Sequence, residues 1–251
     1  DQVTLSFAES CLKKIISFNY VSSITHASFL TSLFSAILSI ISQARSLNAL
    51  TSSSVTGTID TTSTISAMLD SSTGITESGG SNAYTIAIAS GDSTASVSDL
   101  NSLNALTTVV VNISNVDTLS SSSLADLGTF ASNISGFSNV TGITSIAISD
   151  TTIEANTLAS RIDSFDSINS GGTTNMTLVS GATINVSSES EITEMLDDKS
   201  AGRLTIVDQN INVDSGSISV ANAILLAAAT TGTITATIAT TESVDSLKTL
   251  Y

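Results

Sequence analysis

One unit recurs along most of this sequence and limits what the chain can fold into. Each copy is a run rich in β-branched residues, then a turn, then a short segment with the apolar spacing of a helix. The centres of the runs lie about 25–35 residues apart, within the range of repeat proteins. The runs predicted as strands are Val55–Ile59, Tyr84–Ala89, Thr108–Ile113, Ile143–Ile148, Asn175–Val179, Ala182–Val186, Leu204–Val207 and Thr233–Ile238. The segments predicted as helices are Thr64–Leu69, Val97–Leu106, Leu124–Phe130, Ile153–Phe165, Ile192–Leu196, Val220–Ala228 and Val244–Leu250.

Strands that alternate with helices at this spacing pair as parallel neighbours, because the helix carries the chain back to the edge where the strand began. We therefore predict an α/β fold for residues 51–251: a solenoid of stacked strand–helix repeats with parallel strands. The successive units diverge in sequence, and the stretch Asn169–Val186 holds two strands. A doubly wound α/β sheet stays open as an alternative, although no Gly-rich nucleotide-binding turn marks one.

The predicted helix starts share a capping signal. A Ser or Thr precedes an acidic residue by three positions, which is the spacing of a capping box. Asp60, Asp92 and Asp150 follow predicted strands, and we interpret them as turn and cap formers. The four predicted boxes are Ser96/Asp99, Ser123/Asp126, Thr151/Glu154 and Ser188/Glu191.

Residues 1–50 differ from the rest and form a separate region. Apolar residues recur there at helical spacing, which predicts a helical segment preceding the repeats. The stretch Phe29–Ile41 is apolar apart from Ser and Thr, so an export role for this segment would bring membrane contact through residues 28–44. We favour a helical cap over the end of the repeats, with an export segment or an assembly helix pair as the alternatives.

The charge balance narrows the set of partners. The chain carries 22 acidic residues against 7 Lys and Arg, for a formal net charge of -15. Nucleic acid is an unsuitable partner because its phosphates require clustered basic side chains. About a third of the residues are Ser or Thr, well above the usual share. This composition, with a single cysteine (Cys11), favours an extracellular or cell-surface location without internal disulfides.

Three stretches carry a family resemblance: AYTIAIASGDSTASVSDLNSLNALTT, VTGITSIAISDTTIEANTLASRIDSF and SISVANAILLAAATTGTITATIATTESVDSLKTL. They resemble tandem repeats in giant secreted cell-surface proteins of marine cyanobacteria, a class that includes a surface protein associated with swimming motility. The resemblance covers residues 82–251 and does not extend to residues 1–50. It implies a secreted surface or filament component without enzymatic activity.

Candidates for catalysis are scarce. His26 is the single histidine, so any Ser–His–Asp or Cys–His arrangement would depend on it. The acid pairs Asp197/Asp198 and Glu191/Glu194 lack the aromatic platforms typical of carbohydrate-cleaving sites, and we interpret them as a solvated helix face. We predict that the chain is not an enzyme.

One segment has the character of a cation site. Alternation along a strand would place Asp208, Asn210, Asn212 and Asp214 on one face, with Ile211 and Val213 on the other. Oxygen ligands of this kind suit calcium, so these four residues are a candidate Ca²⁺ site, and a strand with a polar outer face is the alternative. The segment does not match an EF-hand loop, because Val213 stands where that loop needs glycine.

These observations favour a structural extracellular repeat protein, a subunit of a cell-surface filament, sheath, S-layer or giant adhesin. Self-association into a homopolymer or filament is the expected partnership. The alternative is a module that binds a receptor or a cell-surface glycan, such as a phage fibre or adhesin tip.

Overall fold

The computed structural model describes residues 41–49, 54–59, 61–75, 82–170, 172–214 and 216–250. The helices expected before residue 41, and most of the 28–44 segment, lie outside these ranges, as does Asp60. The described part of the predicted N-terminal helical segment is α3 (Ile41–Asn48). Ala44 of this helix is buried in the same apolar core as the units that follow.

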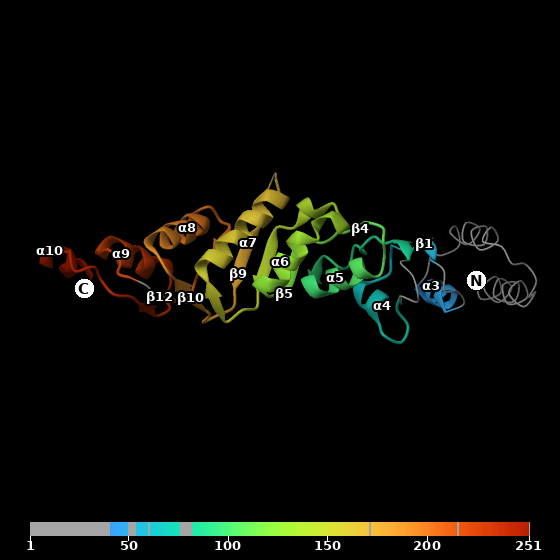
Figure 1. Cartoon of the computed structure of the whole chain (residues 1–251), viewed down its shortest axis with the longest axis horizontal. Helices are drawn as coiled ribbons and strands as arrows, with labels where there is room; N and C mark the ends of the chain where they lie inside the picture. The colour runs from blue at the N-terminus through green and yellow to red at the C-terminus, as the bar shows by residue number, and fades with distance from the viewer. Residues whose placement is uncertain are drawn as a thin grey trace, which may run out of the picture.

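Helices and strands alternate along an elongated α/β molecule, from α3 near one end to α10 at the other (Figure 1). The later helices are α4 (Ile65–Leu69), α5 (Val97–Ala105), α6 (Leu124–Ser132), α7 (Ala155–Ile168), α8 (Glu189–Ser200), α9 (Val220–Ala229) and α10 (Val244–Leu247). Short 3₁₀ turns are η1 (Ile134–Gly136), η2 (Val140–Gly142) and η3 (Lys248–Leu250). The strands are β1 (Thr56–Thr58), β2 (Ala83–Thr85), β3 (Thr94–Ser96), β4 (Val111–Asn112), β5 (Thr118–Ser122), β6 (Phe137–Ser138), β7 (Ser145–Ile148), β8 (Thr152–Glu154), β9 (Asn175–Leu178), β10 (Thr183–Val186), β11 (Leu204–Thr205), β12 (Asn210–Val213) and β13 (Ile234–Thr235).

Every described strand pair is parallel, and the strands join one unit to the next. The two larger sheets have the orders β11-β9-β7-β5-β3 and β13-β12-β10-β8, so the order never reverses within a sheet. A doubly wound sheet reverses at its switch point. The predicted α/β class with parallel strands is therefore confirmed, and the doubly wound alternative does not describe these sheets.

The chain enters its helices from different sheets as it proceeds. Helices α5 and α6 follow strands of the five-stranded sheet, β3 and β5, while α7 and α8 follow β8 and β10 of the four-stranded sheet. Before α9 the chain adds a further parallel bridge, which joins Ile218 to Ile238. The sheet that contains the strand before each helix therefore changes about once every two units.

Alternation explains why these short segments form strands. In β7, Ile146 and Ile148 are buried while Ser145 and Ala147 point away from the core. Because side chains alternate across a strand, each strand needs only one or two large aliphatic residues to fill its part of the core. A chain with 4% aromatic residues can therefore build a continuous core from thin layers of Ile, Val and Leu.

Three of the phenylalanines link neighbouring units in this core. The ring of Phe130 in α6 lies 4.8 Å from that of Phe137 and 6.0 Å from that of Phe165 in α7, centroid to centroid. Each contact of this kind contributes roughly 0.5–1.5 kcal/mol beyond simple burial. The aromatic stack therefore reinforces the packing of α6 on α7.

Sequence patterning located the helices better than the strands. Each predicted helix is present within a few residues of its expected bounds, and each predicted aliphatic run contains a strand. The sequence did not predict strands at β3, β5 and β8, because their sequences, TAS, TLSSS and TIE, are mostly hydroxyl or acidic residues. Ile153 and Glu154 of β8 were predicted to begin a helix, and the two-residue strand β6 was not predicted either. Strands β5 and β8 pair with the aliphatic strands β7 and β10, and β3 pairs with β5, so pairing rather than local sequence makes these segments strands.

Three of the four predicted capping boxes have a capping Ser. Ser96 and Ser188 accept hydrogen bonds from the backbone N–H groups three residues on, and Ser123 also donates to the Asp126 carboxylate at 2.7 Å. The box predicted at Thr151 and Glu154 is wrong. Glu154 ends β8, and α7 begins directly after it without a side-chain cap.

Candidate functional site

Acidic side chains of one unit accept hydrogen bonds from the first residue of the helix in the preceding unit. The first backbone N–H of a helix has no partner within that helix, and a carboxylate from the following unit accepts its hydrogen bond. This arrangement confirms the cap-forming interpretation of Asp92 and Asp150, although both act on a neighbouring helix. The bonds run from Ile65 N to Asp92 Oδ2 at 2.6 Å, from Leu124 N to Asp150 Oδ2 at 2.7 Å and from Val220 N to Glu242 Oε1 at 3.0 Å.

A ladder of polar side chains crosses the outer face of the four-stranded sheet. Glu154, Asn185 and Asn212 occupy equivalent positions in β8, β10 and β12. Asn185 Nδ2 donates to Glu154 Oε1 at 2.8 Å, and Asn212 Nδ2 donates to Asn185 Oδ1 at 3.3 Å. Side-chain amides in register can bond from strand to strand, so the ladder joins three units by contacts outside the core.

The residues predicted to bind calcium are placed partly as the sequence suggested. Asn210 and Asn212 share the outer face of β12, and Ile211 and Val213 are buried on the other face. Asp208, however, lies in the bend that precedes β12, and Asp214 follows its last residue. The four side chains therefore do not form one continuous strand face.

Protein groups already bond to each of these four side chains. The Asp208 carboxylate accepts from Ser180 Oγ at 2.5 Å, and this hydrogen bond lowers the pKa of Asp208. The other contacts are Asn210 Nδ2 to Gly181 O at 3.1 Å, Thr233 N to Asn210 Oδ1 at 2.9 Å, Asn212 Nδ2 to Asn185 Oδ1 and Ser187 Oγ to Asp214 Oδ1 at 3.4 Å. Among the described residues, no group of three or more His, Cys, Asp or Glu side chains is placed to hold a metal ion. Calcium at these residues stays a prediction.

An open depression of about 410 Å³ lies beside α8. Acidic and hydroxyl side chains line it, together with one basic group, Arg203. The residues that line it are Asp163, Ser190, Thr193, Glu194, Asp197, Asp198 and Arg203.

Asp198 in this depression departs from the predicted solvated face. It is 3% exposed, and Arg203 donates to its Oδ1 from Nε at 2.9 Å and from a terminal nitrogen at 2.6 Å. Burial raises the pKa of Asp198, and the guanidinium opposes that rise. Asp166 lies 3.7 Å from the other side of Arg203. The prediction of a solvated face is wrong for Asp198, because no sequence pattern indicates that Arg203 folds back onto it.

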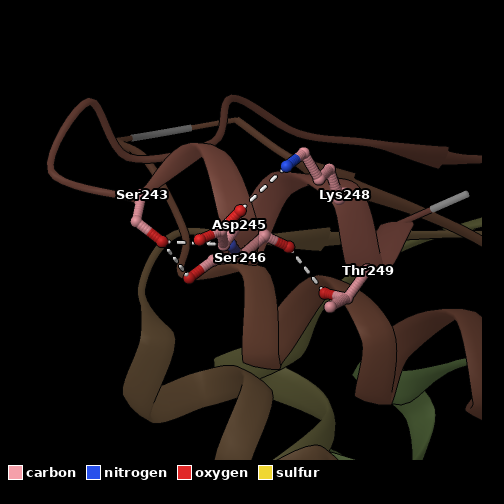
Figure 2. A network of polar contacts seen from close by, with 5 residues as sticks. All are labelled: Ser243, Asp245, Ser246, Lys248 and Thr249. Carbon is pink, nitrogen blue, oxygen red and sulfur yellow. Dashed lines mark hydrogen bonds and ion pairs between the residues drawn. The ribbon is translucent and has the colours of Figure 1, made fainter.

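A small polar network lies around α10 and η3. Figure 2 shows Ser243, Asp245, Ser246, Lys248 and Thr249 around α10 and η3. Ser243 caps α10 by accepting from Ser246 N, and Lys248 Nζ lies 2.9 Å from Asp245 Oδ1. This ion pair is largely exposed and contributes little to stability.

The described surface also includes exposed aliphatic side chains near that end. They lie on α9 (Ile224 and Leu225) and on α10 and η3 (Val244, Leu247 and Leu250). The sequence signal for this surface was present in the composition of Val220–Ala228, which contains no charged residue. Because nearly all residues of this segment are apolar, the spacing of apolar residues does not show which face of the helix is buried.

Comparisons with known proteins do not assign the chain to a class. No family model matches the sequence, and the curated proteins and the solved structures gave no significant match. Within the described ranges, no helix has both the length and the apolar character needed to cross a membrane.

Proposed function

We propose that this protein is a structural repeat protein of the cell surface, a solenoid that serves as a subunit of a filament, sheath, S-layer or giant adhesin. The observation that carries the proposal is the unit-to-unit register of the strands. The five-stranded sheet, for example, runs through β3, β5, β7, β9 and β11, each pair parallel. Units that bury their apolar faces on one another build length and stiffness, which suits a structural role.

Contacts outside the core support the same proposal. The polar ladder at Asn185 and the carboxylate caps at Ile65 and Leu124 each join residues of adjacent units. They act in addition to aliphatic packing, so separating two units would break hydrogen bonds as well as expose apolar surface. Such a chain transmits tension from unit to unit.

The net charge of -15 and the sequence resemblance support the proposed extracellular location. A strongly acidic surface keeps a long particle soluble and discourages unspecific contacts with other acidic surfaces. Self-association then requires a defined surface that is free of charge.

Small-angle scattering and negative-stain microscopy of the purified full chain test the proposal. We expect an elongated particle, alone or in linear assemblies. A compact particle with the radius of gyration of an ordinary globular domain of this length, about 18 Å, would contradict it. Saturable binding of one glycan or receptor by a chain that forms no higher assembly would instead favour the alternative of a binding module.

A further inference from the structure

Helix α9 presents a second apolar stripe that faces away from the core. Val220, Leu226 and Ala229 are its buried residues. On the opposite side Ile224 is 41% and Leu225 is 52% exposed. Residues at intervals of three and four lie on one helix face, and the exposed stripe consists of Ala221, Ile224, Leu225 and Ala228.

The neighbouring helix α8 has an exposed face of a different kind. The exposed positions of α8 include Glu189, Ser190, Thr193, Glu194 and Asp197, which are the charged and hydroxyl residues expected at a solvated face. Helix α9 also buries one face in the core, but its exposed positions carry no charged or hydroxyl residue. An exposed apolar helix face on an acidic protein marks a surface that contacts another molecule.

The net charge of the protein and the contacts that α9 already makes indicate the kind of partner. The protein carries a net charge of -15, so two copies repel one another over most of their surface. Helix α9 contains no charged residue, which makes its face a place where two copies can meet without burying like charges. The face also continues a contact that the fold already uses, because α9 packs against α8 on one side and η3 on the other.

The stripe is symmetric about its own midpoint. It runs small, large, large, small, and the intervals between its residues are three, one and three. Two such helices related by a two-fold axis would place Ile224 against Leu225 of the second copy, and Ala221 against Ala228 of the second copy. Small residues at both ends allow the two helices to approach closely. A two-fold interface requires such self-complementarity.

We propose that a second copy of this chain packs its α9 antiparallel against α9, and that this contact forms a two-fold dimer. Val244, Leu247 and Leu250, exposed on α10 and η3, extend the apolar surface at the same end of the molecule. The proposal rests on the structural role proposed above and names the partner in its self-association. The dimer joins two elongated particles, and a longer assembly would need a further contact.

The first test is the mass of the full-length protein in solution, measured by sedimentation across a range of concentrations. We expect a dimer for the native sequence, and at least a tenfold rise in its dissociation constant for Ile224→Glu or Leu225→Glu. Because both side chains are exposed, circular dichroism should show an unchanged fold. Thr193→Glu is the matched control: it adds the same charge at an exposed position of α8, outside the stripe, and the dimer should persist.

Cysteine cross-linking tests the antiparallel arrangement. With Cys11→Ser as the background, a mixture of Ala221→Cys and Ala228→Cys chains should form disulfide-linked dimers faster than either variant alone. Faster linking of each variant to itself would show a parallel arrangement and overturn the proposal.

A native protein that stays monomeric at high micromolar concentration would also overturn the proposed dimer. So would a native protein that binds zwitterionic lipid vesicles through Leu225 without forming a dimer. The proposed function has a separate test, since the shape of a single chain is measured on the Leu225→Glu monomer. An elongated monomer with no native dimer would reject the α9 contact and leave the structural role standing.

Discussion

The Asp92 carboxylate accepts a hydrogen bond from the backbone N–H of Ile65 at 2.6 Å, although 27 residues separate them. Ile65 begins α4, whereas Asp92 lies in the turn after the next unit's first strand. The same relationship recurs between Asp150 and Leu124. An acid in one unit thus stabilises the helix of the unit before it, and the two units become dependent on one another.

Removal of such a cap should destabilise the protein measurably. We expect Asp150→Ala to lower the free energy of unfolding by about 1–2 kcal/mol, because the Leu124 N–H loses its acceptor. Asp150→Asn keeps an acceptor oxygen and should retain most of the stability. Denaturant titration measures both variants. Asp197→Ala, which removes an exposed acid of α8, is the control, and an equal loss there would contradict the assignment.

The Asp198–Arg203 pair should be strongly coupled. Arg203→Met leaves a buried carboxylate without its cation and should cost about 3 kcal/mol. Replacing both residues, Asp198→Leu with Arg203→Met, should recover much of that loss. Asp166→Ala should cost under about 1 kcal/mol, because this acid is more exposed and lies farther from Arg203. A double-mutant cycle gives the coupling, and additive losses would show that the pair is not coupled.

Low pH should lower the free energy of unfolding, because it protonates carboxylates that bond between units. Hydrogen bonds from Ser219 and Ser180 lower the pKa values of Glu189 and Asp208 respectively. The unfolded chain then takes up protons before the folded chain does, so stability present above the ordinary pKa values is lost as the pH falls below about 4. Asp198 acts in the opposite sense, since its pKa is raised.

The measurement is the unfolding midpoint in urea between pH 7 and pH 3. We expect a fall for the native protein and a shallower fall for Glu189→Gln with Asp208→Asn. A midpoint that does not change across this range would contradict the prediction.

Two glycines should respond differently to the same substitution. A Cβ at Gly232 would lie 2.3 Å from the backbone oxygen of Gln209, in the unit before it. Gly232→Ala should therefore cost about 1–3 kcal/mol, because two backbone segments must separate. Gly91 has open space around its Cβ position, so Gly91→Ala should be neutral or slightly stabilising. Thermal unfolding compares the two variants, and equal effects would argue against the close approach.

The sequence by itself determined the α/β class and the placing of the helices. Helical spacing and a capping Ser are local features, so Ser96 and Ser123 marked helix starts correctly. Aliphatic runs such as β10 also located their strands, because alternation of buried and exposed residues is a local property of the chain. The acidic, charge-poor composition argues against nucleic acid as a partner, and this stays a prediction.

Only the tertiary structure decided how the units join. Strand β5, with the sequence TLSSS, is a strand because β3 and β7 lie beside it in register. Asp150 reaches the helix of another unit, and Arg203 covers Asp198, through contacts that depend on the path of the whole chain. The exposed face of α9 follows the same rule: its apolar content is evident in the sequence, but the side that the core covers is fixed by packing against α8 and η3.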